Sequence, residues 1–453
     1  HWQAALNAMP ANANAQTMTV TGDGKTMTFE DVLIGEVWIC SGQSNMEMEV
    51  FKARDPQKEM QAATDTSIRL CKLYRNSSDT PLEDVAKLRQ WMECSPRNVK
   101  LFSAVGYYFG RELRQKLNVP IGLISSSWGG TPAESWTSMP TLKADSRFQY
   151  RFDNWESGLK SYPGRLAKWE QAKAERDAQI KKWLTENPGK TAKDAPAKKL
   201  PRKPYDPATN PWRPASLYNA MIHPLAPYTV KGAIWYQGES NWRNPNEYQY
   251  ILPALINDWR KLWDQKEFHF GIVQLANFRG IDKEPKDPAW AHIRDAQLKT
   301  AQTLPNAGIA VIIDIGEARD IHPKNKQDVG KRLALWAQHD VYQTIDSNWI
   351  GPVFETFNVD GNKIKLTFKH VDDKLTTRDG KAPAELIICG EDKKWVWANA
   401  RITGSNTIEV WADGITKPVA VRYAWANNPA NPNLTDASNL PASPFRTDDW
   451  QQK

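Results

Sequence analysis

The feature that most restricts the fold is a regular alternation of apolar runs and helical segments between residues 32 and 337. Residues 32–40 are almost continuously apolar, as expected of a strand buried on both faces of a sheet. Further segments follow in turn, with strands expected at 119–125, 231–236, 268–275 and 307–313, and helices at 103–116, 247–263, 289–303 and 326–337. Strands and helices that alternate at this spacing form a parallel sheet covered by helices on both faces. We therefore predict an α/β domain over residues 32–348.

Both ends of the chain have the two-residue periodicity of β-strands instead. Residues 17–29 alternate around Gly22-Asp23-Gly24, which is typical of a hairpin. Beyond residue 349, short alternating runs are separated by turn residues, at 359–368, 385–389, 395–397, 407–411 and 419–423. This pattern predicts a β-sandwich over residues 349–453. Because residues 1–31 are too few to fold alone, we expect these N-terminal strands to complete the sandwich.

Residues 151–214 interrupt the α/β pattern. Apolar residues between 166 and 184 recur near helical spacing, and a stretch rich in lysine and proline follows at 190–203. We interpret the segment as a helical insertion with a solvated loop. The basic loop contributes to the net charge of +7, but no aromatic residues interleave its charges, so we expect no nucleic-acid binding.

Other features exclude further classes of protein. The longest apolar runs, such as 309–313, are far shorter than the roughly 20 residues that cross a bilayer, so we expect no membrane insertion. No basic and apolar leader is visible after His1. The four cysteines form no CxxC pair and no zinc-ligand spacing with histidine. Cys71 and Cys94 form a disulfide if the protein is exported, or are buried thiols.

Three polar motifs come directly after predicted strands. They are Ser-Gly-Gln-Ser-Asn-Met at 41–46, Trp-Gly-Gly-Thr at 128–131, and Trp-Tyr-Gln-Gly-Glu-Ser-Asn at 235–241. Ligands of open α/β sheets bind outside the carboxyl ends of the strands, so we expect the motifs to meet there. Each has an ordinary structural interpretation when taken alone: a helix N-cap, a tight turn and a buried amide.

Ser44 is the candidate nucleophile of the first motif. A turn between a strand and a helix exposes a serine hydroxyl, and the start of the helix offers backbone N–H groups to an oxyanion. A nucleophilic serine needs a base. His322 fits this need, because it lies in a loop between a predicted strand and helix and not on an apolar face.

In their order along the chain, four motifs resemble those of the sialate O-acetylesterase family of the SGNH hydrolase superfamily. They are Gly-Gln-Ser-Asn-Met at 42–46, Trp-Gly-Gly-Thr at 128–131, Tyr-Gln-Gly-Glu-Ser-Asn at 236–241 and Asp-Ile-His-Pro at 320–323. Residues 102–113 and 440–448 are also similar to that family. The resemblance implies a flavodoxin-like catalytic domain with an appended β-sandwich, which hydrolyses acetyl esters on sugars without a metal or cofactor.

The resemblance also implies roles for individual residues. Ser44 would be the nucleophile and His322 the base. The oxyanion hole would consist of the backbone N–H groups of Ser44 and Gly129 and the side chain of Gln237, which replaces an asparagine common in the wider superfamily. Asn241 is the alternative amide donor. Substrate contacts would come from Asn45, Trp128, Glu239 and Asn241.

The acid that orients the base departs from the superfamily pattern. The wider superfamily has an aspartate three residues before its histidine, where this chain has Arg319. Asp320 lies two residues before His322 and is our choice for the acid. The alternatives are a Ser–His dyad helped by a backbone carbonyl, and Glu317 or Asp314.

Several functional hypotheses remain open at the level of the sequence. The motifs are expected to bind the acetyl group and not the sugar. An acetylxylan esterase or another polysaccharide acetylesterase therefore agrees with the motifs as well as a sialate esterase does. A catalytically silent carbohydrate-binding protein is a further alternative, given the 21 tryptophans. The expected partner is an acetylated sugar or glycan, and this substrate class predicts a periplasmic or extracellular location. The oligomeric state has no signature in the sequence.

Overall fold

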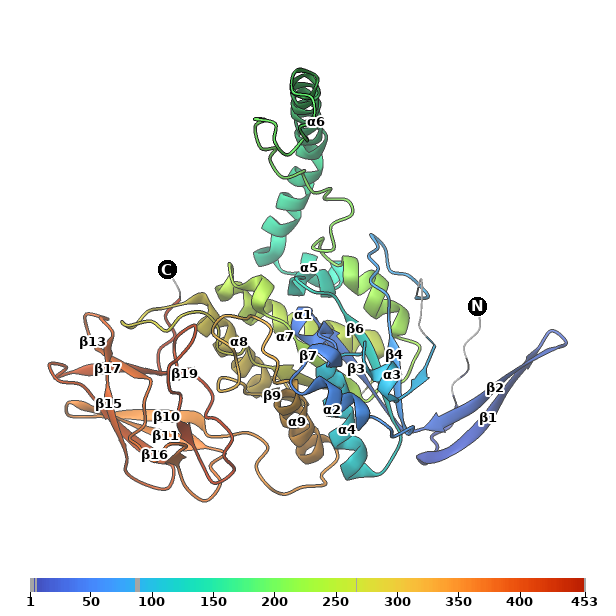
Figure 1. Cartoon of the computed structure of the whole chain (residues 1–453). Helices are drawn as coiled ribbons and strands as arrows, with labels where there is room; N and C mark the ends of the chain where they lie inside the picture. Colours follow the sequence, from blue (N-terminus) through green and yellow to red (C-terminus); the bar gives the residue numbers. More distant parts are fainter. Residues whose placement is uncertain (1–3, 5, 86–89, 266, 452–453) are drawn as a thin grey trace.

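A seven-stranded sheet forms the centre of the computed structural model, which describes residues 4, 6–85, 90–265 and 267–451 (Figure 1). In spatial order its strands are β5 (Met92–Glu93), β4 (Ile68–Lys72), β6 (Ile121–Ser127), β3 (Glu36–Gly42), β7 (Gly232–Tyr236), β8 (His269–Val273) and β9 (Ala307–Ala310). Every neighbouring pair is parallel except β5 with β4. From β6 to β9 the strand order is that of flavodoxin-like sheets. The predicted α/β fold is confirmed.

Two pairs of long helices cover the sheet. They are α4 (Ala104–Leu117) with α9 (Lys326–Trp336), and α7 (Pro245–Trp263) with α8 (Ala289–Thr303). Trp38 of β3 contacts Phe109 of α4 and Trp336 of α9, with ring centroids 5.1 Å and 6.0 Å away. Trp235 of β7 contacts Trp259 of α7 at 5.8 Å. The register of β3 and β7 points Trp38 and Trp235 to opposite faces, so α4 and α9 cover one face and α7 the other.

Short helices occupy most connections between these elements. They are α1 (Ser44–Glu47), η1 (Val50–Lys52), α2 (Pro56–Gln61), α3 (Pro96–Val99), η2 (Ala133–Trp136), α5 (Met139–Lys143), η3 (Ser146–Phe148), η4 (Tyr218–Ile222), η5 (His223–Leu225), η6 (Glu239–Asn241) and η7 (Ala337–Val341). The four long helices were predicted with ends within two residues of those observed. The hydroxyl of Ser103 caps α4 by accepting a hydrogen bond from the N–H of Gly106.

The strand predicted over residues 32–40 is divided between two elements. Residues 32–34 belong to β2 (Lys25–Ile34), and β3 begins at Glu36. Gly35 lies between them, where a Cβ atom would come 2.1 Å from the carbonyl oxygen of Pro120. The close approach of two backbones at this glycine separates the strands.

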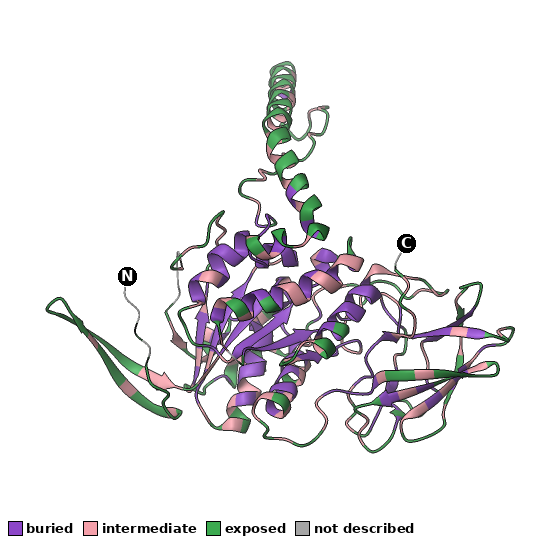
Figure 2. Cartoon of the chain, turned by 180° about the vertical axis from the view of Figure 1, so that it is seen from behind, coloured by how far each residue is buried: buried purple, intermediate pink, exposed green. Residues whose placement is uncertain are grey.

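The N-terminal strands do not complete the sandwich, and that prediction is wrong. β1 (Asn12–Gly22) pairs with β2 in a separate two-stranded sheet. Figure 1 shows this hairpin at the end of the molecule opposite the sandwich, and Figure 2 shows it largely exposed. The reason is the chain connection: β2 runs directly into β3 of the central sheet. An ion pair between Arg69 of β4 and Asp31 of β2 holds the base of the hairpin there.

The C-terminal region forms the predicted β-sandwich. One antiparallel sheet has the order β10 (Val353–Asp360), β11 (Lys363–Lys369), β16 (Thr407–Trp411) and β15 (Asn399–Ile402). The other has the order β14 (Val396–Trp397), β13 (Leu386–Gly390), β17 (Pro418–Tyr423) and β19 (Phe445–Arg446). A separate pair consists of β12 (Thr376–Thr377) and β18 (Leu434–Thr435). Phe445 of one sheet stacks on Phe354 of the other at 4.7 Å and meets the edge of Phe368. These rings form part of the core between the two sheets.

A buried arginine joins the sandwich to the α/β unit. Arg294 of α8 is fully buried, and its guanidinium donates to the carbonyls of Leu275 and Ala276 and to those of Ala426 and Asn427. Burial lowers the pKa of Arg294 to about 9. Because four carbonyls from two segments share one cation, the C-terminal region is fixed to this edge of the sheet.

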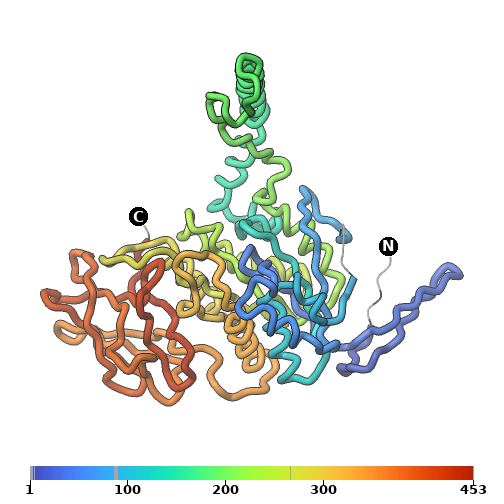
Figure 3. The backbone as a smooth tube through the Cα atoms, viewed as in Figure 1, coloured from blue at the N-terminus to red at the C-terminus, as the bar shows by residue number. Residues whose placement is uncertain are grey.

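The insertion is dominated by one long helix, α6 (Gln149–Glu186). This helix projects from the molecule, and the chain returns beside its lower part (Figures 1 and 3). Trp169 of α6 fixes the return by donating its Nε1 hydrogen to the carbonyl of Pro201. Most of α6 is exposed (Figure 2). Among the described residues, no helix is both long enough and apolar enough to span a membrane.

The cysteines do not form the disulfide that the sequence permitted. Cys94 is a buried free cysteine, so a bond between Cys71 and Cys94 is absent. Burial raises the pKa of the Cys94 thiol to about 12. Cys94 therefore remains an unreactive thiol at neutral pH.

The packing of Trp336 gives a first testable prediction. A Cβ atom on Gly308 of β9 would lie 2.1 Å from the indole of Trp336. We expect Gly308→Ala to lower the free energy of unfolding by about 1–3 kcal/mol because the indole must shift in a full core. Thermal unfolding measures the change. Gly164→Ala is the control, since nothing lies within 4 Å of its added Cβ; equal melting temperatures for the two variants would contradict this packing account.

Candidate active site

Ser44 lies where β3 passes into α1. Gly42 turns the chain with a φ of 137°, and a Cβ at this position would come 2.2 Å from the carbonyl oxygen of Tyr236 in β7. The turn needs glycine because the backbones of β3 and β7 meet here. Ser44 is the first residue of α1 and is half-buried. It thus lies at the switch point of the sheet, where ligands of such folds bind.

The structure brings Ser44 and His322 together. The Nε2 atom of His322 lies 2.8 Å from the Oγ atom of Ser44, which is hydrogen-bond distance. His322 comes from the loop between β9 and α9, far from Ser44 in sequence. This contact has the geometry by which an imidazole takes the proton of a serine hydroxyl.

Asp320 lies beside the imidazole but does not bond to it. Its carboxylate accepts a hydrogen bond of 2.9 Å from the backbone N–H of His322. The same carboxylate is 3.7 Å from Nδ1 of His322, which is too long for a hydrogen bond. Because Asp320 lies only two residues before His322, its carboxylate bonds to the backbone of the turn and stays near Nδ1 without bonding to it.

The two other candidate acids have different partners. Glu317 accepts a hydrogen bond from the backbone N–H of Lys324. Asp314 is held by Arg332 and Arg378, each 2.6 Å away. Asp314 therefore joins α9 to the sandwich and is not oriented toward the imidazole.

The environment of His322 keeps its imidazole neutral. Burial lowers the pKa of His322 below its usual value of 6.5, and the nearby charges of Lys326 and Lys52 lower it further. The carboxylate of Asp320 acts in the opposite direction but does not cancel these effects. A neutral imidazole is the form that accepts a proton.

The backbone N–H of Ser44 is available to a ligand. Within the described part of the chain, this group donates to no acceptor. Ser44 is the first residue of α1, and the N–H of a first helical residue has no acceptor inside the helix. The prediction that Ser44 offers a donor at its own site agrees with this geometry.

Gly129 lies against Ser44, but its N–H is already occupied. A Cβ on Gly129 would be 3.2 Å from Cβ of Ser44. The Gly129 N–H donates to the carboxylate of Glu47 at 2.8 Å, and Arg75 donates to the same carboxylate at 2.6 Å. The Gly129 N–H is therefore occupied in this arrangement, and its role as an oxyanion donor stays a prediction. The competing group, Glu47, lies three residues after Ser44.

Gln237 is not an available oxyanion donor either. Its side chain is fully buried, and its amide nitrogen donates to the carbonyl of Thr131 and to the side-chain oxygen of Asn241. The side chain of Asn241 in turn donates to Glu134. Both amide hydrogens of Gln237 are used within this network. Gln237 and Asn241 thus support the loop after β6, and Asn241 is removed from direct substrate contact.

Asn45 and Glu239, predicted as substrate contacts, are buried and bound to each other. The Asn45 amide donates to Glu239 at 2.6 Å and to the carbonyl of Ile321 at 2.9 Å. Its oxygen accepts from Lys326 at 2.5 Å. Since Ile321 precedes His322, this single side chain joins the serine helix to the histidine loop. Both side chains are buried, so their predicted substrate role stays a prediction, while their role in positioning is plain from these contacts.

Lys326 and Glu239 are buried ionisable groups. Burial lowers the pKa of Lys326 to about 7, and burial raises the pKa of Glu239. The Lys326 ammonium also lies 5.0 Å from the ring centre of Tyr236. Burial of two ionisable groups is costly, and their hydrogen bonds to Asn45 offset part of the cost.

An open pocket of about 830 Å³ contains the Ser44–His322 pair. It is lined by Ser44, Glu47, Met48, Glu49, Phe51, Lys52, Ala53, Arg54, Asp55, Pro56, Arg75, Asp320, His322 and Lys324. Trp128 is half-buried beside it, with the guanidinium of Arg75 5.6 Å from its ring. Trp128 is thus the one predicted substrate contact that is still accessible next to the pair.

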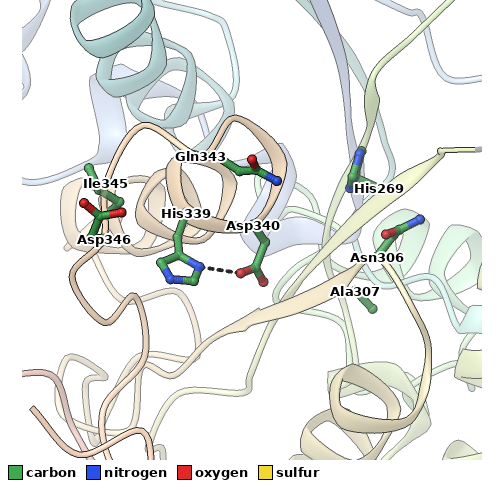
Figure 4. Close-up of a pocket in the computed structure, with 8 residues that line it drawn as sticks. All are labelled: His269, Asn306, Ala307, His339, Asp340, Gln343, Ile345 and Asp346. Carbon is green, nitrogen blue, oxygen red and sulfur yellow. Dashed lines mark hydrogen bonds and ion pairs between the residues drawn. The ribbon is translucent and has the colours of Figure 1, made fainter.

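A second pocket lies away from this chemistry. Figure 4 shows its residues, among them His269 at the start of β8, Ala307 at the start of β9, and the bonded pair His339 and Asp340. It occupies the amino-terminal edge of the sheet. The described residues contain no group of three histidine, cysteine or acidic side chains arranged to hold a metal.

Sequence reasoning missed Glu47, Arg75 and Lys326. Lys326 begins a helix in a polar stretch, where a lysine is normally solvated, so its burial has no signal in the sequence. Arg75 lies far from any motif. Glu47 had one signal, since an acid three residues after Ser44 on a helix occupies the face next to it.

Comparisons with known proteins identify relatives that are described as carbohydrate acetylesterases or sialate O-acetylesterases. A family model described as "Carbohydrate esterase, sialic acid-specific acetylesterase" matches residues 207–338. The chain is 31% identical to the sialate O-acetylesterases of Homo sapiens and Mus musculus, over 98% of its own length and 81% and 83% of theirs. A crystal structure of a carbohydrate acetylesterase from Xanthomonas citri superposes with a TM-score of 0.79 at 36% identity, covering 98% of this chain and 88% of that one.

The matches to the human esterase and to the Xanthomonas citri structure cover 98% of the chain, so they extend over both the α/β unit and the sandwich. The chain therefore belongs to the sialate O-acetylesterase family of carbohydrate esterases.

Proposed function

We propose that this protein is a serine esterase that removes O-acetyl groups from sugars. The observation that carries the proposal is the distance of 2.8 Å between Ser44 Oγ and His322 Nε2 in an open pocket at the switch point of the sheet. The family of the chain supplies the substrate class. A catalytically silent binding protein has no need for this pair.

The proposed reaction proceeds through an acetyl-enzyme. The Ser44 oxygen attacks the acetyl carbonyl carbon while His322 Nε2 takes the hydroxyl proton. The C–O bond to the sugar then breaks, and His322 returns the proton to the departing sugar oxygen. Water attacks the acetyl-serine with the same help from His322 and releases acetate. Each step moves one proton through Nε2 of His322.

The oxyanion is held first by the backbone N–H of Ser44. The N–H of Gly129 joins it when the acetyl oxygen replaces the carboxylate of Glu47, which stays paired with Arg75. Each such donor contributes on the order of 10²–10³ in kcat. This scheme drops Gln237 from the oxyanion hole.

Asp320 and Asn45 have supporting roles in this proposal. Asp320 shapes the turn that carries His322 and stabilises the imidazolium from 3.7 Å, which makes a Ser–His dyad with a nearby carboxylate the better description. Asn45 fixes the distance between the two reacting side chains through its bond to Ile321.

The identity of the sugar is a separate question. The pocket is open and broad, which suits an acetyl group on a polysaccharide as well as one on a sialic acid. Acetate release from 9-O-acetyl sialic acid and from acetylated xylan, measured side by side, separates the two. A location in the periplasm or outside the cell accords with either substrate.

The first prediction about activity concerns the reacting pair. Ser44→Ala and His322→Ala should each lower kcat for p-nitrophenyl acetate by at least about 10³-fold, because each removes a group that takes part in every step. Circular dichroism should remain that of the wild type. Activity of Ser44→Ala within tenfold of the wild type would exclude this nucleophile.

A second prediction concerns pH. Because His322 must be neutral to act and its pKa is lowered, kcat/KM should fall only below pH 6.5. Lys52→Met should move this acid limb to higher pH by removing a positive charge, and Asp320→Asn should move it to lower pH. Shifts of the same sign in both variants would show that His322 is not the titrating group.

A third prediction concerns Glu47. A carboxylate beside a developing oxyanion opposes its charge and competes for the Gly129 N–H. We expect Glu47→Gln to raise kcat/KM for p-nitrophenyl acetate several-fold. Glu49→Gln, which removes an acid from the same pocket but not from Gly129, should have little effect. A tenfold loss in Glu47→Gln alone would mean that Glu47 supports the reaction.

A further inference from the structure

A separate pocket of about 460 Å³ lies where the insertion joins the α/β unit. Its walls are the base of α6, the return segment 205–214, η2 and the residue before α7. The lining residues are Glu134, Tyr150, Arg151, Asn154, Trp155, Gly158, Arg165, Tyr205, Pro207, Asn210, Trp212, Arg213, Pro214 and Asn244. None of these side chains belongs to the Ser44 pocket.

Aromatic rings are exposed around this pocket. Tyr205 is 59% exposed, Trp212 55% and Tyr150 38%. Trp155 is half-buried in the same wall. Large aromatic side chains left in water beside a cavity mark a binding site more often than a structural one. Their flat faces suit ligands that present flat apolar surfaces, as sugar rings do.

The floor of the pocket is a fixed polar network. Arg151 pairs with Glu134 of η2 and with Glu247 of α7. Tyr150 donates to Glu247 at 2.5 Å and accepts from Asn244 at 2.9 Å. These contacts tie α6 to the α/β unit and set the positions of the side chains before any ligand arrives.

Polar side chains of the lining remain accessible beside these rings. Asn154 is exposed and Asn210 is half-buried. A side-chain amide carries both hydrogen-bond donors and an acceptor, so these residues can contact groups of either kind.

This mixture of groups suits the hydroxyls of a sugar, because a hydroxyl both donates and accepts hydrogen bonds. The charged residues that line the pocket are Arg151, Arg165, Arg213 and Glu134, and the carboxylate of Glu134 is already paired with Arg151. Stacked bases would also suit the aromatic rings, so single-stranded DNA belongs in the test. The family of the chain, which consists of carbohydrate esterases, favours a glycan.

The pocket lies at the same edge of the sheet as Ser44. η2 follows the carboxyl end of β6, and Asn244 comes shortly after the carboxyl end of β7. Figures 1 and 3 show α6 rising from this edge. Both pockets are therefore lined by segments that follow the same edge of the sheet.

We propose that this pocket is a glycan-binding subsite, which holds an unesterified part of a polysaccharide while the acetyl group reacts at Ser44. The inference rests on the proposed esterase function and extends it by assigning the substrate class of polymeric glycans. Trp212 and Tyr205 supply the stacking surfaces, and Asn154 and Asn210 supply hydrogen-bonding groups.

The test compares a polymer with a small ester. For wild type, Trp212→Ala and Tyr205→Ala, kcat/KM is measured on p-nitrophenyl acetate and on acetylated xylan, pectin, galactoglucomannan and mucin. We expect each variant to lose about tenfold on the best of these polymers through a higher KM, and to keep the wild-type value on p-nitrophenyl acetate. Trp397→Ala, which removes a tryptophan that is 43% exposed on the sandwich, should change neither.

A binding measurement separates the subsite from the reaction. Affinity electrophoresis of Ser44→Ala in gels containing each polymer should show retardation that the added Trp212→Ala change removes. If a polymer retards the protein but the wild type releases no acetate, the subsite is supported and the proposed esterase function is contradicted. Three outcomes would overturn the subsite. The first is acetate release without retardation by any polymer, the second is an equal loss of activity on the polymer and the small ester, and the third is retardation by single-stranded DNA alone.

Discussion

The parallel pairing of β3 with β6 on one side and β7 on the other determines where the chemistry of this protein lies. Ser41 of β3 pairs with Ser126 and with Trp235, so all three strands end at one level. The motifs that follow them therefore meet without any long excursion of the chain. Gly42 permits this meeting, because its backbone lies against that of Tyr236. A side chain at Gly42 would separate β3 from β7 and displace Ser44 from the imidazole.

A second constraint holds the base loop in place. The loop that carries His322 has no regular structure, yet the bond from Asn45 to the carbonyl of Ile321 fixes it against α1. Asn45 is held in turn by Lys326 and Glu239, both buried. Burying these two ionisable side chains costs free energy, and apolar side chains would fill the same space at a lower cost. We therefore interpret Lys326 and Glu239 as residues that position Asn45. The rigid support explains how two side chains so distant in sequence lie within hydrogen-bond distance.

The sequence predicted those parts of the structure that depend on local pattern. The strand and helix alternation gave the sheet, and the position of Ser44 and His322 at strand ends gave the pair. The predictions failed where tertiary partners decide the outcome. Nothing local indicates that Glu47 accepts from Gly129, that Asn241 uses the amide of Gln237, or that residues 1–31 stay with β3 and not with the sandwich. Each of these depends on a neighbour that only the folded chain provides.

The central claim is that Ser44 becomes acylated with the help of His322, and covalent labelling tests it most directly. A fluorophosphonate reacts only with a serine that a base has activated. Peptide mass spectrometry of the labelled protein should find the adduct on Ser44, and the His322→Ala variant should label at least about 10²-fold more slowly. Labelling at another serine, or equal labelling of Ser44 in both proteins, would contradict the account.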